Sequence, residues 1–165
     1  MQIKRILLIG SVIFLASGCG SREETKAPQR PSSQQLVQQG MQFLSDGDVL
    51  RAVQNFDAAI KVDPRNVQNY LVLGQVYFRL KQFDRAASTY EAATRVEPAS
   101  GEAFYFLAAS RALQGPEMRG EAIKAAKHSA EIFYQKQDEE RFKQSVALVK
   151  NLTDNLPPVE ELQKQ

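Results

Sequence analysis

The middle of the chain alternates amphipathic segments with short polar breaks. Apolar and small residues recur within each segment at helical spacing, which predicts helices that bury one face. The break at 46–48 contains Asp and Gly, and Pro64 and Pro98 end later segments because proline cannot continue a helix. The pattern predicts helices over 34–45, 49–62, 66–80 and 83–96.

These helices form two pairs whose residues correspond at a distance of 34 positions. The first pair contains Leu36, Gly40, Phe43, Ala52, Phe56, Ala59 and Pro64, and the second contains Tyr70, Gly74, Tyr77, Ala86, Tyr90, Ala93 and Pro98. Leu73 departs from the correspondence, since its counterpart is Gln39. This period and pattern resemble the tetratricopeptide repeat, a helix–turn–helix unit that stacks into a solenoid. We predict that the glycines and alanines lie at close helix contacts and that the aromatic rings fill the core.

A third repeat begins with Phe104, Leu107 and Ala108 and then departs from the pattern. Arg111 replaces the large aromatic residue, and residues 115–120 lengthen the turn by about two residues, which costs little entropy. The second helix of this repeat resumes with a seam of small residues, which are Ala122, Ala126 and Ser129. A last amphipathic helix over 138–152 is predicted to bury Phe142, Val146 and Val149 and to cap the solenoid.

The predicted fold is therefore all-α, an α-solenoid of three helix–turn–helix repeats followed by a capping helix. The repeats span about 33–66, 67–100 and 101–135, within a folded region over 34–153. Residues 154–165 are predicted to form a polar tail.

The resemblance implies that the first helices of the repeats line a concave surface that binds a protein partner. In this register the predicted groove residues are Val37, Met41, Leu44, Leu71, Gln75, Phe78, Arg79, Tyr105, Phe106 and Ala109. The chaperone-adaptor members of the family hold a carboxylate with cations, whereas the matching positions here are Val37, Met41, Val72, Glu102 and Phe106. An apolar segment is therefore the expected ligand, although the cap helix or a second copy of the chain could cover the same residues instead.

The first residues of the chain have the pattern of a secretory signal. Lys4 and Arg5 precede an uncharged, mostly apolar run over 6–16, which is too short to span a bilayer as a mature helix. The following Ala16-Ser17-Gly18-Cys19 resembles the bacterial lipobox, which implies cleavage of residues 1–18 and lipidation of Cys19, a palmitate-type anchor. An ordinary signal peptide or an uncleaved anchor is the alternative. By the family rule, Gly20 in place of aspartate favours the periplasmic face of the outer membrane.

Residues 19–33 are polar, and we expect them to form a disordered tether. Loss of residues 1–18 would leave equal numbers of basic and acidic side chains, so the one-signed surface typical of nucleic-acid binding is not expected. Cys19 and His128 are the only residues of their kinds. No cofactor, metal site or catalytic activity is therefore expected, apart from the covalent lipid.

The sequence predicts a membrane-anchored interaction module that acts as an adaptor or assembly factor for a cell-envelope complex. It resembles the small repeat-containing lipoproteins of bacterial envelopes, of which the pilotins of type IV pili are the nearest in kind. Two alternatives stay open at this point: a homo-oligomeric structural lipoprotein, and a substrate adaptor for an envelope protease or peptidoglycan enzyme.

Overall fold

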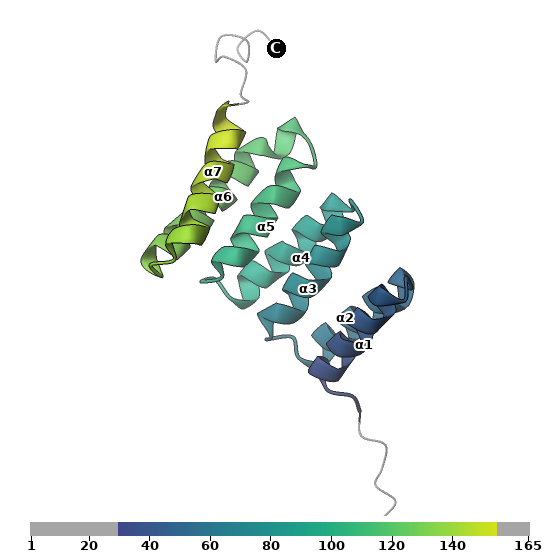
Figure 1. Ribbon diagram of the computed structural model, residues 1–165. Helices are drawn as coiled ribbons and strands as arrows, with labels where there is room; N and C mark the ends of the chain where they lie inside the picture. The colour runs from purple at the N-terminus through teal and green to yellow at the C-terminus, as the bar shows by residue number, and fades with distance from the viewer. Residues whose placement is uncertain (1–29, 155–165) are drawn as a thin grey trace, which may run out of the picture. The chain divides into compact units, whose positions relative to one another are not determined.

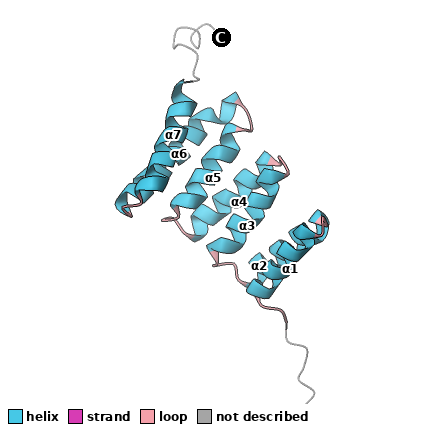
Figure 2. Ribbon diagram, viewed as in Figure 1, coloured by secondary structure: helices cyan, strands magenta, loops and turns pink. Residues whose placement is uncertain are grey.

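The computed structural model describes residues 30–154, and the regular structure of this part is entirely helical (Figures 1 and 2). The elements are α1 (Ser33–Ser45), α2 (Val49–Val62), α3 (Val67–Arg79), α4 (Phe83–Val96), α5 (Gly101–Ala112), a short 3-10 helix η1 (Pro116–Met118), α6 (Arg119–Gln135) and α7 (Glu139–Asp154). The predicted signal peptide (1–18), Cys19, residues 20–29 of the tether and residues 155–165 of the tail lie outside the described residues.

Helix boundaries follow local capping chemistry. The Ser32 hydroxyl accepts from the Gln35 N–H, and the Gln35 side chain accepts in return from the Ser32 N–H, which forms a capping box before α1. Asp48 and Ser100 cap α2 and α5 through their side chains. These bounds agree with the predicted ones, except that α7 continues past residue 152 to Asp154 and so takes in the first tail residue.

In each of the first two repeats, a glycine of the first helix packs against an aromatic ring of the second helix. A Cβ atom on Gly40 would lie 2.7 Å from the Phe56 ring, and one on Gly74 would lie 2.6 Å from the Tyr90 ring. Both rings are fully buried, as are the alanines Ala52, Ala59, Ala86 and Ala93. The prediction that small residues allow close helix approach is confirmed, because only glycine leaves room for the ring at these contacts.

The rings also join one repeat to the next. Phe56 clusters with Leu73 and Val76 of α3, while Tyr90 clusters with Leu107 and stacks on Phe106 at a centroid distance of 5.4 Å. Helix α7 packs against the second of these clusters, so the cap and the third repeat share a core.

Arg111 joins three helices at the position where the first two repeats carry an aromatic ring. Its guanidinium forms ion pairs with Glu91 of α4 at 3.2 Å and Glu121 of α6 at 3.0 Å, and its side chain is 18% exposed. At this position the third repeat thus has a half-buried charge network in place of a ring. The seam predicted for its second helix, Ala122, Ala126 and Ser129, is fully buried, as expected.

The turn between α6 and α7 has the same form as the turn inside each of the first two repeats. Gly47, Lys81 and Gln137 occupy equivalent positions with φ of 79°, 57° and 56°. The N–H groups of Asp48 and Asp138, one residue later, donate to the carbonyls five residues before them. The chain therefore turns from α6 into α7 in the same way as it turns from the first helix of a repeat into the second.

The buried face of α7 differs from the predicted one. Ser145 is fully buried, and its hydroxyl lies 2.9 Å from that of Ser129, which donates to the Gly101 carbonyl. Val146 is 44% exposed, so the prediction that it faces the core is wrong. The periodicity of the apolar residues misled because a pair of buried hydroxyls, not a valine, occupies the contact between α6 and α7.

Replacing Tyr90 by Phe is expected to leave the free energy of unfolding unchanged or raise it by about 1 kcal/mol at neutral pH. The Tyr90 hydroxyl is buried without a hydrogen-bond partner among the described residues, and the equivalent residue of the first repeat is Phe56. Burial raises the pKa of the Tyr90 hydroxyl in the folded state. Above about pH 10, the hydroxyl therefore loses its proton in the unfolded chain but keeps it in the folded chain. Stability of the wild type relative to Y90F therefore falls above that pH, by at most about 1.4 kcal/mol per pH unit.

Urea denaturation at pH 7 and at pH 11 measures both parts of this prediction. Because the variant keeps every other tyrosine, the difference between the two proteins reports Tyr90. A large loss of stability in the variant at pH 7 would show that the hydroxyl has a partner and would contradict the account.

Candidate functional site

A first hollow lies between α1 and α3, on the face predicted for the groove. Its volume is about 230 Å³. The lining is apolar except for one amide and one cation, and consists of Met41, Leu44, Val72, Gln75, Val76, Arg79 and Leu80. Four of the ten predicted groove residues, Met41, Leu44, Gln75 and Arg79, therefore meet in one place. Met41 is 53% exposed, so a ligand could reach it.

A second hollow, of about 220 Å³, lies where α5 approaches α7. It is lined by Glu102, Tyr105, Phe106, Phe133, Arg141 and Gln144. The Tyr105 and Phe106 rings meet edge to face at a centroid distance of 5.5 Å, and Phe106 lies on the buried ring of Tyr90. Two of the three predicted aromatic groove residues, Tyr105 and Phe106, therefore pack on the core beneath them.

Four predicted groove residues contribute less than expected. Leu71 is 7% exposed and belongs to the core cluster around Tyr90, so its assignment to an open groove is wrong. Phe78 is half-buried and packs edge to face on Phe83 of α4, at 5.5 Å. Val37 and Ala109 are half-buried, and Val37 packs against the cluster around Phe56. These residues support the groove more than they line it.

The capping helix supplies groove residues that the sequence analysis missed. Arg141 and Gln144 of α7, with Phe133 of α6, form one side of the second hollow. The shared turn accounts for their position. In the first two repeats, the Arg51 guanidinium lies over the Phe43 ring and the Arg85 guanidinium lies over the Tyr77 ring. In the same way, the Arg141 guanidinium lies 5.0 Å from the centre of the Phe133 ring. The eight-residue spacing of each aromatic–Arg pair was a signal that could have revealed the match.

The charges of the groove differ between the two hollows. Arg79 forms no ion pair within the described residues and is exposed, whereas Arg141 donates from Nε to Asp138 at 2.6 Å. The backbone N–H and the guanidinium of Arg141 hold the pKa of Asp138 below its usual range. Glu102 is exposed beside Phe106 and would oppose a carboxylate ligand there. The first hollow, in contrast, offers an uncompensated cation beside an apolar surface.

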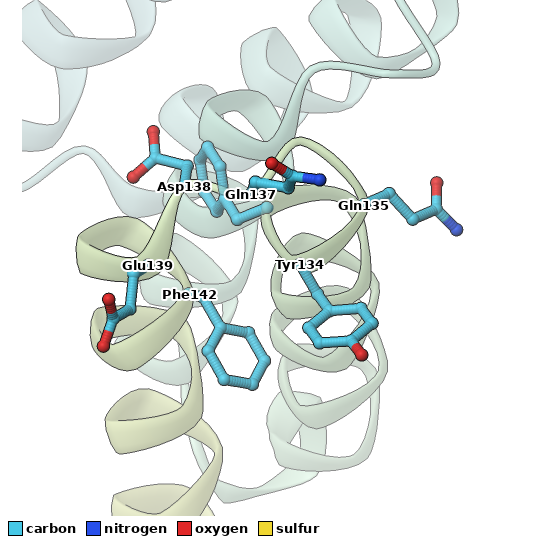
Figure 3. A pocket seen from close by; sticks show the side chains of 7 residues that line it. Tyr134, Gln135, Gln137, Asp138, Glu139 and Phe142 are labelled. Atoms are coloured by element: carbon cyan, nitrogen blue, oxygen red, sulfur yellow. The ribbon is translucent and has the colours of Figure 1, made fainter.

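A larger hollow, of about 540 Å³, lies at the α6–α7 turn (Figure 3). Tyr134, which is 71% exposed, and Phe142 face each other there with centroids 5.7 Å apart. Both carboxylates of the rim have partners, since Asp138 pairs with Arg141 and Glu139 pairs with Lys143. This hollow lies at the end of the α6–α7 hairpin, outside the predicted groove.

Within residues 30–154, no three His, Cys, Asp or Glu side chains come together as ligands for a metal ion. Among the same residues, no helix has the length and apolar character needed to cross a bilayer.

Comparisons with known proteins identify the repeats. Residues 43–110 match the family model of the tetratricopeptide repeat. A curated relative, the tetratricopeptide repeat and J domain-containing co-chaperone DNJ1 of Cryptococcus neoformans, is 28% identical over 114 residues. That match covers 68% of this chain and 21% of the relative, so the chain spans about a fifth of that protein.

Solved structures of similar fold include three that bear on recognition. The TPR2B domain of yeast Sti1, in complex with pHsp70, has a TM-score of 0.67 at 14% identity and covers 75% of this chain and 98% of its own. The translocator chaperone SycD of Yersinia enterocolitica has a TM-score of 0.65 at 17% identity and covers 75% and 87%. PcrH, in complex with the chaperone-binding region of PopD, has a TM-score of 0.65 at 16% identity and covers 73% and 90%. At these identities the likeness shows the fold, and it confirms the predicted all-α solenoid.

Proposed function

We propose that the chain, whose residues 43–110 match the family model of the tetratricopeptide repeat, binds an apolar segment of a protein partner in its concave groove. Proteins built from such repeats are typically interaction modules or chaperone-like adaptors rather than enzymes. The observation that carries the proposal is the pair of hollows, one between α1 and α3 and one between α5 and α7. Each is the size of a side chain or two, and each presents aromatic or aliphatic side chains to a ligand.

Apolar anchoring distinguishes this groove from one that clamps a carboxylate with several cations. The positions that matched the clamp hold Val37, Met41, Val72, Glu102 and Phe106, and none of these is basic. Tyr105 and Phe106 are preorganised by the core, so little conformational entropy is lost when a ligand packs on them. Rigid aromatic anchors of this kind carry much of the binding energy at protein interfaces.

Met41→Arg is expected to weaken partner binding about tenfold or more, because it places a charge in the apolar part of the first hollow next to Arg79. The side chain is half exposed, so folding is preserved. Leu50→Arg is the matched control, since Leu50 is 70% exposed on α2, away from the hollow. Native complexes would be isolated from the host through each variant. Equal recovery of the partner with M41R and L50R would remove the groove proposal.

We also propose that Cys19 carries a lipid that anchors the module to the cell envelope, on the periplasmic face of an outer membrane. The lipobox-like residues before Cys19 support this assignment, as does the polar stretch that separates it from α1. The module would then act as an assembly factor for an envelope complex, in the manner of the pilotins it resembles. Its partner would be presented close to the membrane surface.

Cys19→Ala is expected to leave an unprocessed, unlipidated precursor, because diacylation requires the thiol. Metabolic labelling with palmitate and the apparent mass of the chain measure this directly. A variant that still incorporates palmitate would show that the anchor lies elsewhere. Ser17→Ala is the control, because it keeps the thiol and a small residue within the motif.

Self-association is the second candidate, and the exposed Tyr134 beside Phe142 favours it. A copy of the chain could cover this apolar contact, as in a homo-oligomeric structural lipoprotein. Light scattering at micromolar concentration separates the two readings. A monomer supports the adaptor, whereas a dimer or larger species that dissociates on Tyr134→Ala supports the oligomer.

A further inference from the structure

We infer that the first hollow, between α1 and α3, binds an aromatic side chain of the partner segment, with a carboxylate next to it that pairs with Arg79. The inference rests on the proposed function, because it names the anchor residue that this half of the groove selects. The same contact between first helices recurs between α3 and α5, where the chain supplies the aromatic rings itself.

The hollow lies where the α1–α3 contact lacks two rings that the α3–α5 contact has. A shift of 34 residues aligns the register of α1 with that of α3, and the register of α3 with that of α5. This shift pairs Leu44 with Phe78, and it pairs Val72 with Phe106. Phe78 and Phe106 are half-buried and pack against the core around Tyr90. Leu44 and Val72 have no ring, and both line the hollow, so a ring from a ligand would complete the pattern of the α3–α5 contact.

The size and the lining of the hollow suit one aromatic ring. Its volume is about 230 Å³, and a cavity of about 150 Å³ is enough to hold a benzene molecule. Met41 contributes a flexible, polarisable thioether, which makes favourable contacts with aromatic rings, and its side chain is 53% exposed. The hollow therefore offers the space and the surface that a phenylalanine or tyrosine side chain needs.

Arg79 adds a cation to the lining, whereas Leu113 occupies the equivalent position of the α3–α5 contact. Arg79 is exposed and forms no ion pair within residues 30–154. Elsewhere in the fold, guanidinium groups lie 4.7 to 5.7 Å from the centres of aromatic rings, in Arg51, Arg85 and Arg141. A guanidinium can lie over a ring and donate from its edge to a carboxylate, so Arg79 favours an aromatic residue with an acidic neighbour.

Methionine methyl NMR on the full chain in lipid nanodiscs tests the inference with three acetylated peptides. The phenylalanine peptide is Gly-Ser-Glu-Phe-Glu-Ser-Gly, the leucine peptide replaces its Phe by Leu, and the glutamine peptide replaces both Glu by Gln. The ring current of the phenylalanine peptide is expected to shift the methyl signal of Met41 and leave that of Met118, in the α5–α6 connection, in place. This peptide is expected to bind about fivefold more tightly than the leucine peptide, and about threefold more tightly than the glutamine peptide at low salt.

Val72→Phe places a ring where the α3–α5 contact has Phe106, so it is expected to fill the hollow and weaken binding of the phenylalanine peptide about tenfold or more. Leu50→Phe is the matched control, since Leu50 is 70% exposed on α2. Circular dichroism shows whether each variant is folded.

Arg79→Gln tests the acidic neighbour independently, on an exposed side chain. It is expected to abolish the preference for the phenylalanine peptide over the glutamine peptide, because the cation that pairs with the carboxylate is gone. Arg65→Gln is the matched control, since it removes the same charge from the loop before α3, and it is expected to keep the preference.

Equal affinities for the phenylalanine and leucine peptides, or an unshifted Met41 signal at millimolar peptide, would overturn the inference. A Met41 signal that depends on protein concentration and reverts with Tyr134→Ala would also overturn it, because the occupant would then be the exposed ring of a second copy. The M41R experiment on partner recovery is independent of these outcomes. Loss of the partner in M41R together with equal peptide affinities would leave the proposed function standing and remove only the aromatic anchor.

Discussion

Gly74→Leu should lower the free energy of unfolding by about 3 kcal/mol or more, because overpacking a tight helix contact forces rings and backbone apart. A Cβ atom at position 74 would lie 2.6 Å from the Tyr90 ring, and the rest of the leucine has no free volume to enter. Tyr90 cannot move aside, because it is fully buried and stacks on Phe106. Urea denaturation followed by circular dichroism measures the loss.

Gly120→Leu is the matched control for this prediction. No atom outside the helix lies within 4 Å of the Cβ position at Gly120, in the first turn of α6. The same substitution there is expected to leave stability unchanged or raise it by about 0.5–1 kcal/mol, since leucine favours the helix over glycine. Equal stabilities for G74L and G120L would mean that α3 and α4 do not pair as described.

Phe133→Ala should cost about 3–5 kcal/mol, the usual loss when a buried phenylalanine is truncated. The ring is 3% exposed, and it lies over Gly101 at the start of α5, where a Cβ atom would come within 2.8 Å of it. The Arg141 guanidinium covers it from α7 at 5.0 Å. Removing the ring therefore loosens the contacts of α6 with both α5 and α7.

Tyr134→Ala controls for the loss of an aromatic side chain at the adjacent position. Tyr134 is 71% exposed, so its truncation is expected to change the free energy of unfolding by less than about 1 kcal/mol. Thermal and urea denaturation of the two variants compare them directly. Greater destabilisation by Y134A than by F133A would show that α6 is rotated relative to its described orientation.

The fold was predictable from the sequence wherever the residues themselves impose the contact. Glycine at positions 40 and 74 allows a ring to approach, and proline at positions 64 and 98 follows the end of a helix, so the period of 34 residues specified both repeats. The third repeat was predictable through its small-residue seam even though Arg111 replaces the ring. Side-chain volume and backbone restriction act locally, which is why a single sequence shows them.

The errors arose where burial depends on a distant partner. Val146 fits an apolar stripe, but Ser145 faces the core because the Ser129 hydroxyl lies opposite it on α6. Leu71 shares the periodicity of a groove residue, but the core around Tyr90 covers it. Periodicity identifies which residues share a helix face, whereas the rotation of the helix depends on what packs against it.

The residues that α1, α3 and α5 contribute to the candidate site were predictable, whereas those of the capping helix were not. Met41, Leu44, Gln75 and Arg79 follow from the repeat register, because α1 and α3 belong to regular repeats. The contribution of Arg141 and Gln144 depends on how the cap docks, and the repeat pattern does not extend to α7. The turn at Gln137 has the same form as the turns inside the first two repeats, and it places Arg141 and Gln144 beside the groove.

Site-specific photo-crosslinking in the native host tests the central claim most directly. A photo-reactive residue replaces Met41 in the first hollow or Tyr105 in the second, and Leu50 on α2 serves as an exposed apolar control. The account predicts that one cell-envelope protein is captured from both groove positions and not from Leu50. Equal capture from all three positions, or crosslinks only to a second copy of the chain, would contradict a groove that binds a partner.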